Sequence, residues 1–132
     1  MKQATRDQFD QQLEAVLAEL PPQVHAILQK VPLIVEDYPS EGLMREQKIR
    51  HRSDLMGFYC GDEGLAKLSY DGPPHLNDSV YLFRLGIMRM AEEIAGRQSN
   101  AELRNQIRIT ILHELGHHHG LDENDLEELG YG

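Results

Sequence analysis

The chain has 132 residues, and its 22 acidic side chains against 13 lysines and arginines give a formal net charge of −9 at pH 7. An acidic balance of this size argues against binding to nucleic acid, because contact with the phosphate backbone needs a basic surface. The single cysteine, Cys60, excludes a disulfide framework and a thiolate zinc finger, and we expect it to be a small core residue.

The apolar runs of the chain are all short. None reaches the length of the apolar region of a signal peptide or of a membrane span. We therefore expect a cytoplasmic protein without a membrane partner. The length fits a single domain over residues 1–132, and nothing in the composition indicates an oligomeric state.

The N-terminal part of the chain predicts two helices and a strand. Thr5 and Gln8 have the spacing of a capping box, and apolar residues then recur at helical intervals until "LPP" (20–22) ends the helix. Pro22 can start a short second helix through "QVHAILQK". The β-branched run in "VPLIVEDYPS" (31–40) predicts a strand.

The middle of the chain predicts a loop followed by strands. Residues 41–54 are polar and basic without periodicity, which indicates a surface loop. The run "LMGFYCG" (55–61) predicts a second strand and "AKLSY" (66–70) a weaker third, with a turn at "DGPP" (71–74). The strongest strand pattern is "SVYLFRLG" (79–86).

The C-terminal part predicts two helices. The run "IMRMAEEIA" (87–95) predicts a short helix that ends at Gly96, and Ser99 or Asn100 can cap a last helix over residues 101–118. Each residue turns the helix by about 100°, so four apolar side chains of this last helix form one broad arc around its axis. Two further apolar residues extend the apolar surface to other sides of the helix. The arc consists of Leu103, Ile107, Ile111 and Leu115, and it is extended by Ile109 and Leu112. The helix is therefore expected to lie inside the domain.

Two histidines and a glutamate stand near the end of this last helix. His113 and His117 are four residues apart, so both imidazoles project from one face, and Glu114 lies beside them. Burying these groups without partners would be costly. A metal ion with a bound water would satisfy all three.

The residues after the helix can complete a ligand set. Gly120 can adopt a left-handed conformation and end the helix, which lets the chain turn back and bring an acid from "LDE" (121–123) toward the two histidines. Two imidazoles and one carboxylate suit Zn²⁺ and leave a fourth position for water.

These residues carry a family resemblance. The stretch "HELGHHHGLDE" resembles the motif HExxHxxGxx(H/D) of metzincin-type zinc peptidases, and the chain from "VEDYP" onward is similar to small bacterial minimal zincin-like metallopeptidases. The resemblance implies an α+β fold with a small mixed sheet packed on the active-site helix. It also implies His113, His117 and Glu123 as zinc ligands, with Asp122 as the main competitor of Glu123, and Glu114 as the general base.

The expected activity is therefore zinc-dependent hydrolysis of peptide bonds in a peptide or protein substrate. Zinc would polarise the scissile carbonyl and acidify a water whose proton Glu114 accepts. The chain departs from larger metzincins in two ways: no methionine follows residue 90, and the second subdomain that walls a peptidase cleft is missing. Zinc binding is thus better supported than peptidase activity.

Two other functions stay open. One is a zinc-stabilised binding module without catalysis. The other is a metal-dependent endoribonuclease, because the ligand spacing also resembles the motif HGxLHLxGYDH of bacterial rRNA-maturation enzymes; Glu114 replaces a glycine of that motif, and the charge of −9 argues against RNA. His118, His119 and Tyr131 are more typical of packing or supporting residues.

Overall fold

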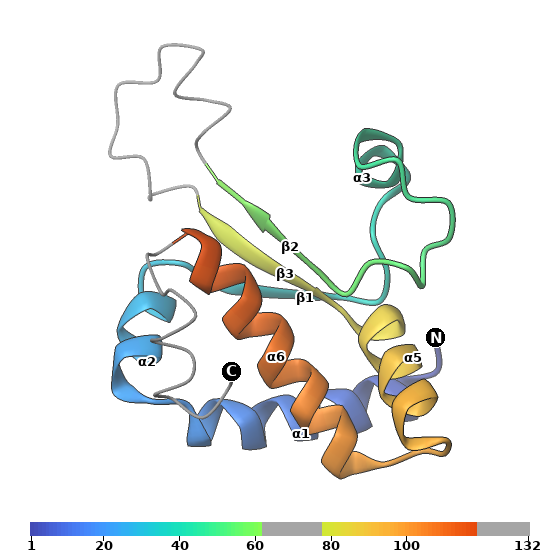
Figure 1. Cartoon of the computed structure of the whole chain (residues 1–132), viewed down its shortest axis with the longest axis horizontal. Helices are drawn as coiled ribbons and strands as arrows, with labels where there is room; N and C mark the ends of the chain where they lie inside the picture. Colours follow the sequence, from blue (N-terminus) through green and yellow to red (C-terminus); the bar gives the residue numbers. More distant parts are fainter. Residues whose placement is uncertain (62–77, 119–132) are drawn as a thin grey trace.

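The computed structural model describes residues 1–61 and 78–118, and it combines a small sheet with several helices. Figure 1 shows α1, α5 and α6 on one side of the sheet and α3 on the other. This arrangement confirms the predicted α+β class with a sheet packed on the C-terminal helix. The elements are α1 (Gln3–Glu19), α2 (Pro22–Leu28), β1 (Leu33–Glu36), α3 (Glu41–Glu46), β2 (Gly57–Cys60), β3 (Ser79–Phe83), α5 (Arg84–Ala95) and α6 (Asn100–His118).

The described sheet is mixed and has three strands in the order β1-β3-β2. β1 runs parallel to β3, with Leu33 opposite Val80, and β2 runs antiparallel to β3, with Tyr59 opposite the same Val80. β3 is therefore the central strand, and four of its five residues are buried. The strands predicted around 31–40, 55–61 and 79–86 are present but shorter. The strand expected at 66–70 and the turn at 71–74 lie outside the described residues.

The core lies between one face of the sheet and the helices α1, α5 and α6. Side chains alternate across a strand, so Tyr59, Val80 and Leu82 all face this core. The apolar arc of the last helix packs against them, as predicted, and Phe9 and Val16 of α1 close the other side. Within the two described segments, no helix is long and apolar enough to cross a membrane.

Several local predictions are wrong. α3 lies within the predicted loop 41–54, because Ser40 caps it: the Ser40 hydroxyl accepts a hydrogen bond from the Leu43 N–H at 3.1 Å. The capping box at Thr5 does not form, since α1 already begins at Gln3 and its N-cap makes no side-chain bond. Cys60 is exposed, because it ends strand β2 on the side away from the core.

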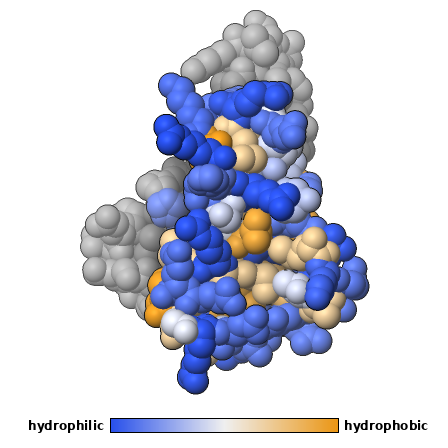
Figure 2. All heavy atoms as spheres, turned by 90° about the vertical axis from the view of Figure 1, so that its right-hand side faces the viewer, coloured by the Kyte–Doolittle hydropathy of each residue, from blue (hydrophilic) through white to orange (hydrophobic). Residues whose placement is uncertain are grey.

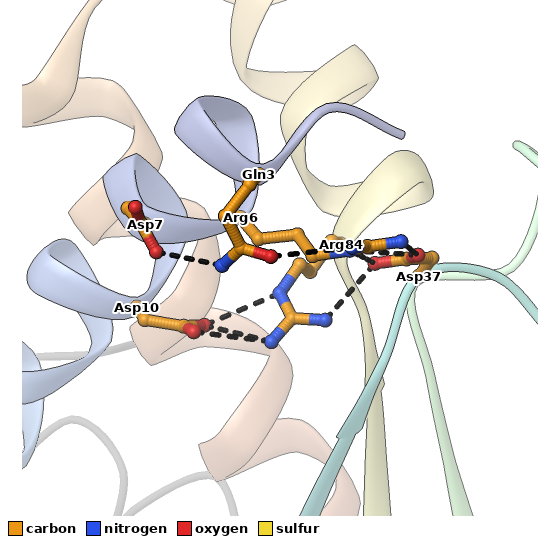
Figure 3. A network of polar contacts seen from close by, with 6 residues as sticks. All are labelled: Gln3, Arg6, Asp7, Asp10, Asp37 and Arg84. Carbon is orange, nitrogen blue, oxygen red and sulfur yellow. Dashed lines mark hydrogen bonds and ion pairs between the residues drawn. The ribbon is translucent and has the colours of Figure 1, made fainter.

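A network of ion pairs joins α1, the end of β1 and the start of α5 (Figure 3). Asp37 accepts hydrogen bonds from Arg6 at 2.7 Å and from Arg84 at 3.0 Å, and Arg84 also binds Asp10 at 3.0 Å. The Asp37 side chain is only 18% exposed. Hydrogen bonds from Arg6 lower the pKa of Asp37, with Arg84 adding to the effect.

Replacing Asp37 tests this network. Asp37→Asn is expected to destabilise the protein by about 1–3 kcal/mol at pH 7, because it removes charge-assisted hydrogen bonds to two arginines. The folded-state pKa of Asp37 is lowered, so its stabilisation is complete above the ordinary aspartate pKa of about 3.9 and is lost as the pH falls through the folded value. Urea titrations should therefore show a gap between variant and wild type that is constant from pH 7 to about pH 5 and shrinks below about pH 4. A gap independent of pH would contradict this role.

Candidate metal-binding site

The helix that carries the histidines, α6, is held along its length. The Ser99 hydroxyl accepts from the Glu102 N–H at 3.1 Å, which confirms one of the two predicted caps. Arg104 then donates to the Gln12 side chain at 2.6 Å, and Arg108 pairs with Glu19 at 3.2 Å, so α6 is tied to α1 at both places. A helix fixed in this way can place its last turns accurately.

One face of α6 is open near its C-terminal end. Ile109 is 43% exposed, and His113, four residues later on the same face, is also exposed. The prediction that Ile109 adds to a buried surface is wrong. The expectation that His113 is buried is wrong as well, since this face points away from the sheet. The backbone of His117 continues the helix one turn further. The face of α6 that carries His113, which we call the histidine face, is therefore accessible from outside at Ile109 and His113.

Glu114, by contrast, lies against the sheet and is half-buried. Its Cγ is 3.5 Å from the position that a Cβ on Gly57 would occupy, and the Thr110 methyl, one turn earlier, is only 2.7 Å from the same position. The missing side chain of Gly57 thus lets α6 approach β2 closely, with the carboxylate-bearing side chain over the start of that strand. Sequence reasoning missed Gly57 and Thr110; a glycine inside a strand pattern is the signal for such a close approach.

We expect Gly57→Ala to lower the stability by about 1–3 kcal/mol, because the new methyl group would overlap the Thr110 methyl group. Thr110→Ser removes that methyl but keeps the hydroxyl, which donates to the Gln106 carbonyl at 2.7 Å. The double variant should therefore recover much of the loss in a thermal or urea denaturation experiment. If Thr110→Ser gives no recovery, the close approach is not what Gly57 provides.

Only some of the residues predicted to form the metal site are among the described residues. The backbones of His113, Glu114 and His117 are described, and so are the side chains of the first two. Glu123, Asp122 and Gly120 lie outside the described residues, as do His119 and Tyr131. No group of three possible metal ligands occurs among the described side chains. Two helical imidazoles plus one carboxylate nevertheless fit the coordination chemistry of zinc.

The protein also has a cavity of about 650 Å³ at the opposite end of α6. It lies between α5, the start of α1 and residues 51–53, with Met88, Ala91 and Leu103 among its lining. Figure 2 shows apolar atoms framed by hydrophilic ones on the face where α5 lies. Neither His113 nor Glu114, the motif residues whose side chains the structure describes, lines this cavity.

A comparison with family models identifies most of the chain. Residues 28–132 match the model of the zincin-like metallopeptidase family, a stretch that includes the sheet and α6 but leaves out α1. Among curated proteins there is no significant match. Because the match covers well over half of the sequence, the chain belongs to the zincin-like metallopeptidase family.

Proposed function

We propose that this protein is a zinc-dependent peptidase in which His113, His117 and Glu123 hold the metal and Glu114 is the general base. The observation that carries the proposal is the position of Glu114, half-buried over the start of β2 and next to the exposed His113. Membership of a metallopeptidase family supports the same reaction class.

Each side chain has a distinct task in this proposal. Bound zinc supplies a Lewis acid that polarises a peptide carbonyl and acidifies a water molecule. Glu114 accepts the proton of the attacking water and passes it to the leaving amine. A general base must stay in one place while it does this, and the half-buried position over Gly57 limits the movement of the Glu114 side chain. His113 and His117 bind through neutral imidazole nitrogens, so acid conditions should release the metal.

The sheet suggests where the substrate lies. β3 has strand neighbours on both sides, whereas β2 pairs only with β3 among the described strands. An extended peptide could therefore add to the edge of β2 that has no partner among the described strands, antiparallel to it, through main-chain hydrogen bonds. The segment "VYLFR" forms the central strand, whereas "LMGFYC" contains β2 and has such an edge. The peptide would then pass beside Glu114.

The test combines metal content with hydrolysis. The purified protein should contain about one zinc per chain and cleave members of a broad peptide library, and a chelator should stop the cleavage. His113→Ala, His117→Ala and Glu123→Ala should each lose zinc, whereas Asp122→Ala should keep it. Protein that takes up no zinc would refute the proposal. Protein that binds zinc but cleaves no peptide would instead be the zinc-stabilised binding module.

A further inference from the structure

The sheet face opposite α6 carries a second cavity, of about 620 Å³. Phe58 and Tyr81 line it, and they alternate along their strands with Tyr59 and Val80, which pack into the core. This cavity and the candidate metal site therefore lie on different faces of the sheet. In Figure 1, α3 stands on the side of the sheet away from α6. We call this cavity the acidic groove.

The floor of the acidic groove is aromatic. Tyr81 and Phe83 of β3 stack with ring centroids 6.2 Å apart and an interplanar angle of 15°. Phe58 of β2 continues this surface, and Tyr38, 40% exposed, stands after the end of β1. Aromatic faces carry negative partial charge, so a row of them attracts cations as well as apolar groups.

The rim of the groove is acidic. Glu36 ends β1, and Glu41 and Glu46 are the first and last residues of α3. All three are exposed, and none of their carboxylates forms a hydrogen bond or ion pair with another residue in the described part of the chain. The described lining contains no lysine, arginine or histidine. The charged side chains that line the described part of the groove are thus all negative, and a basic side chain, Arg52, stands beside them on the Tyr38 ring.

The protein itself shows that an aromatic ring of this groove accepts a guanidinium group. The Cζ atom of Arg52 lies 4.3 Å from the centroid of the Tyr38 ring. This distance is within the range of a cation–π contact. The planar guanidinium also stacks on aromatic faces while its N–H groups remain free to bind carboxylates.

From these observations we propose that the acidic groove docks a basic polypeptide segment, with an arginine side chain of that segment stacked among the aromatic rings and held by the glutamates of the rim. Charge complementarity favours this occupant: a segment with arginines would neutralise carboxylates that have no partner among the described residues. The aromatic floor adds contact area that a simple ion pair lacks. The proposal does not depend on peptidase activity, because the groove and the histidine face are on different sides of the sheet.

The experiment measures peptide binding to the full chain by fluorescence anisotropy. The probe is a labelled pentapeptide GRLRG with blocked ends, compared with the same peptide carrying neutral citrulline in place of arginine. We expect the arginine peptide to bind at least about tenfold more tightly, since charge-assisted and cation–π contacts are both lost with citrulline. Raising the salt concentration should weaken its binding. Mass spectrometry of the peptide after the measurement verifies that it stays intact.

Variants then locate the site. The triple change Glu36→Gln, Glu41→Gln and Glu46→Gln should weaken binding of the arginine peptide about tenfold. The matched control, Glu14→Gln with Glu92→Gln and Glu93→Gln, removes the same charge from α1 and α5 and should bind like the wild type. Tyr81→Leu keeps an apolar surface but removes a ring and should also weaken binding.

Three outcomes would overturn the proposal. Equal weakening by both triple variants would mean that net charge alone attracts the peptide. Equal binding of the arginine and citrulline peptides would mean that the groove is merely apolar. A dimer in analytical ultracentrifugation that dissociates in the groove variant would mean that a second copy of this chain occupies the groove instead of a basic segment.

Discussion

Glu114→Gln should lower the rate of peptide hydrolysis by about two orders of magnitude or more, because the amide keeps the shape of the side chain but cannot accept a proton. Zinc content and melting temperature should stay near those of the wild type, since Glu114 is not a proposed ligand and its contact with the Gly57 backbone region needs only its methylene groups. The measurements are kcat on a cleaved library peptide, zinc by elemental analysis, and thermal denaturation.

A matched control is available on the same helix. Glu102 lies in the first turn of α6 and accepts a hydrogen bond from Gln106 at 3.0 Å. Glu102→Gln makes the same chemical change far along the helix from His113 and should leave hydrolysis unchanged. If Glu114→Gln loses zinc, Glu114 is a ligand or an essential support of one, and the proposed ligand set is wrong.

The largest expected loss of stability comes from a residue outside the site. A Cβ on Gly86 of α5 would lie 2.3 Å from the carbonyl oxygen of Leu55, so the backbone before β2 would have to move. Gly86→Ala should therefore cost about 3 kcal/mol, in spite of the roughly 1 kcal/mol by which alanine favours a helix. Chemical denaturation of the purified variant measures this loss.

Gly42 is the matched control for Gly86. It also lies in a helix, α3, but the nearest atom to a Cβ there is the Ser40 hydroxyl oxygen at 4.0 Å. Gly42→Ala should be neutral or stabilise by up to about 1 kcal/mol. Equal effects of the two changes would show that the approach of α5 to Leu55 is not tight.

The sequence predicted the long elements well and their ends poorly. Apolar residues at helical intervals identified the helix of α1 and the buried arc of α6, because burial decides where such residues lie. The end of β3 was missed by three residues: "FRLG" fits a strand as well as a helix, and the structure turns to helix at Arg84, whose side chain binds Asp10 and Asp37. The local sequence around Arg84 cannot predict these two partners, because they lie far away in the chain.

For the candidate site, spacing predicted which residues share a face but not how that face is oriented. The positions of His113 and His117 one turn apart follow from helical geometry alone. Whether the face of Ile109 and His113 is turned inward depends on how α6 crosses the sheet, and that depends on the contact between Thr110 and Gly57. The spacing of apolar residues along one helix cannot predict a contact between two segments that are distant in the sequence. The choice of Glu123 over Asp122 stays a prediction from the family motif.

The order of the strands has a consequence for how the chain folds during synthesis. β1 and β2 both pair with β3 and not with each other, yet β3 follows them in the chain. A ribosome therefore releases two strands before their common partner exists, and α6, which covers Phe9 and Val16, comes later still. Contacts of such long sequence separation slow folding and leave apolar segments exposed on the nascent chain. Chaperones that bind emerging polypeptides would meet this protein while its core is still open.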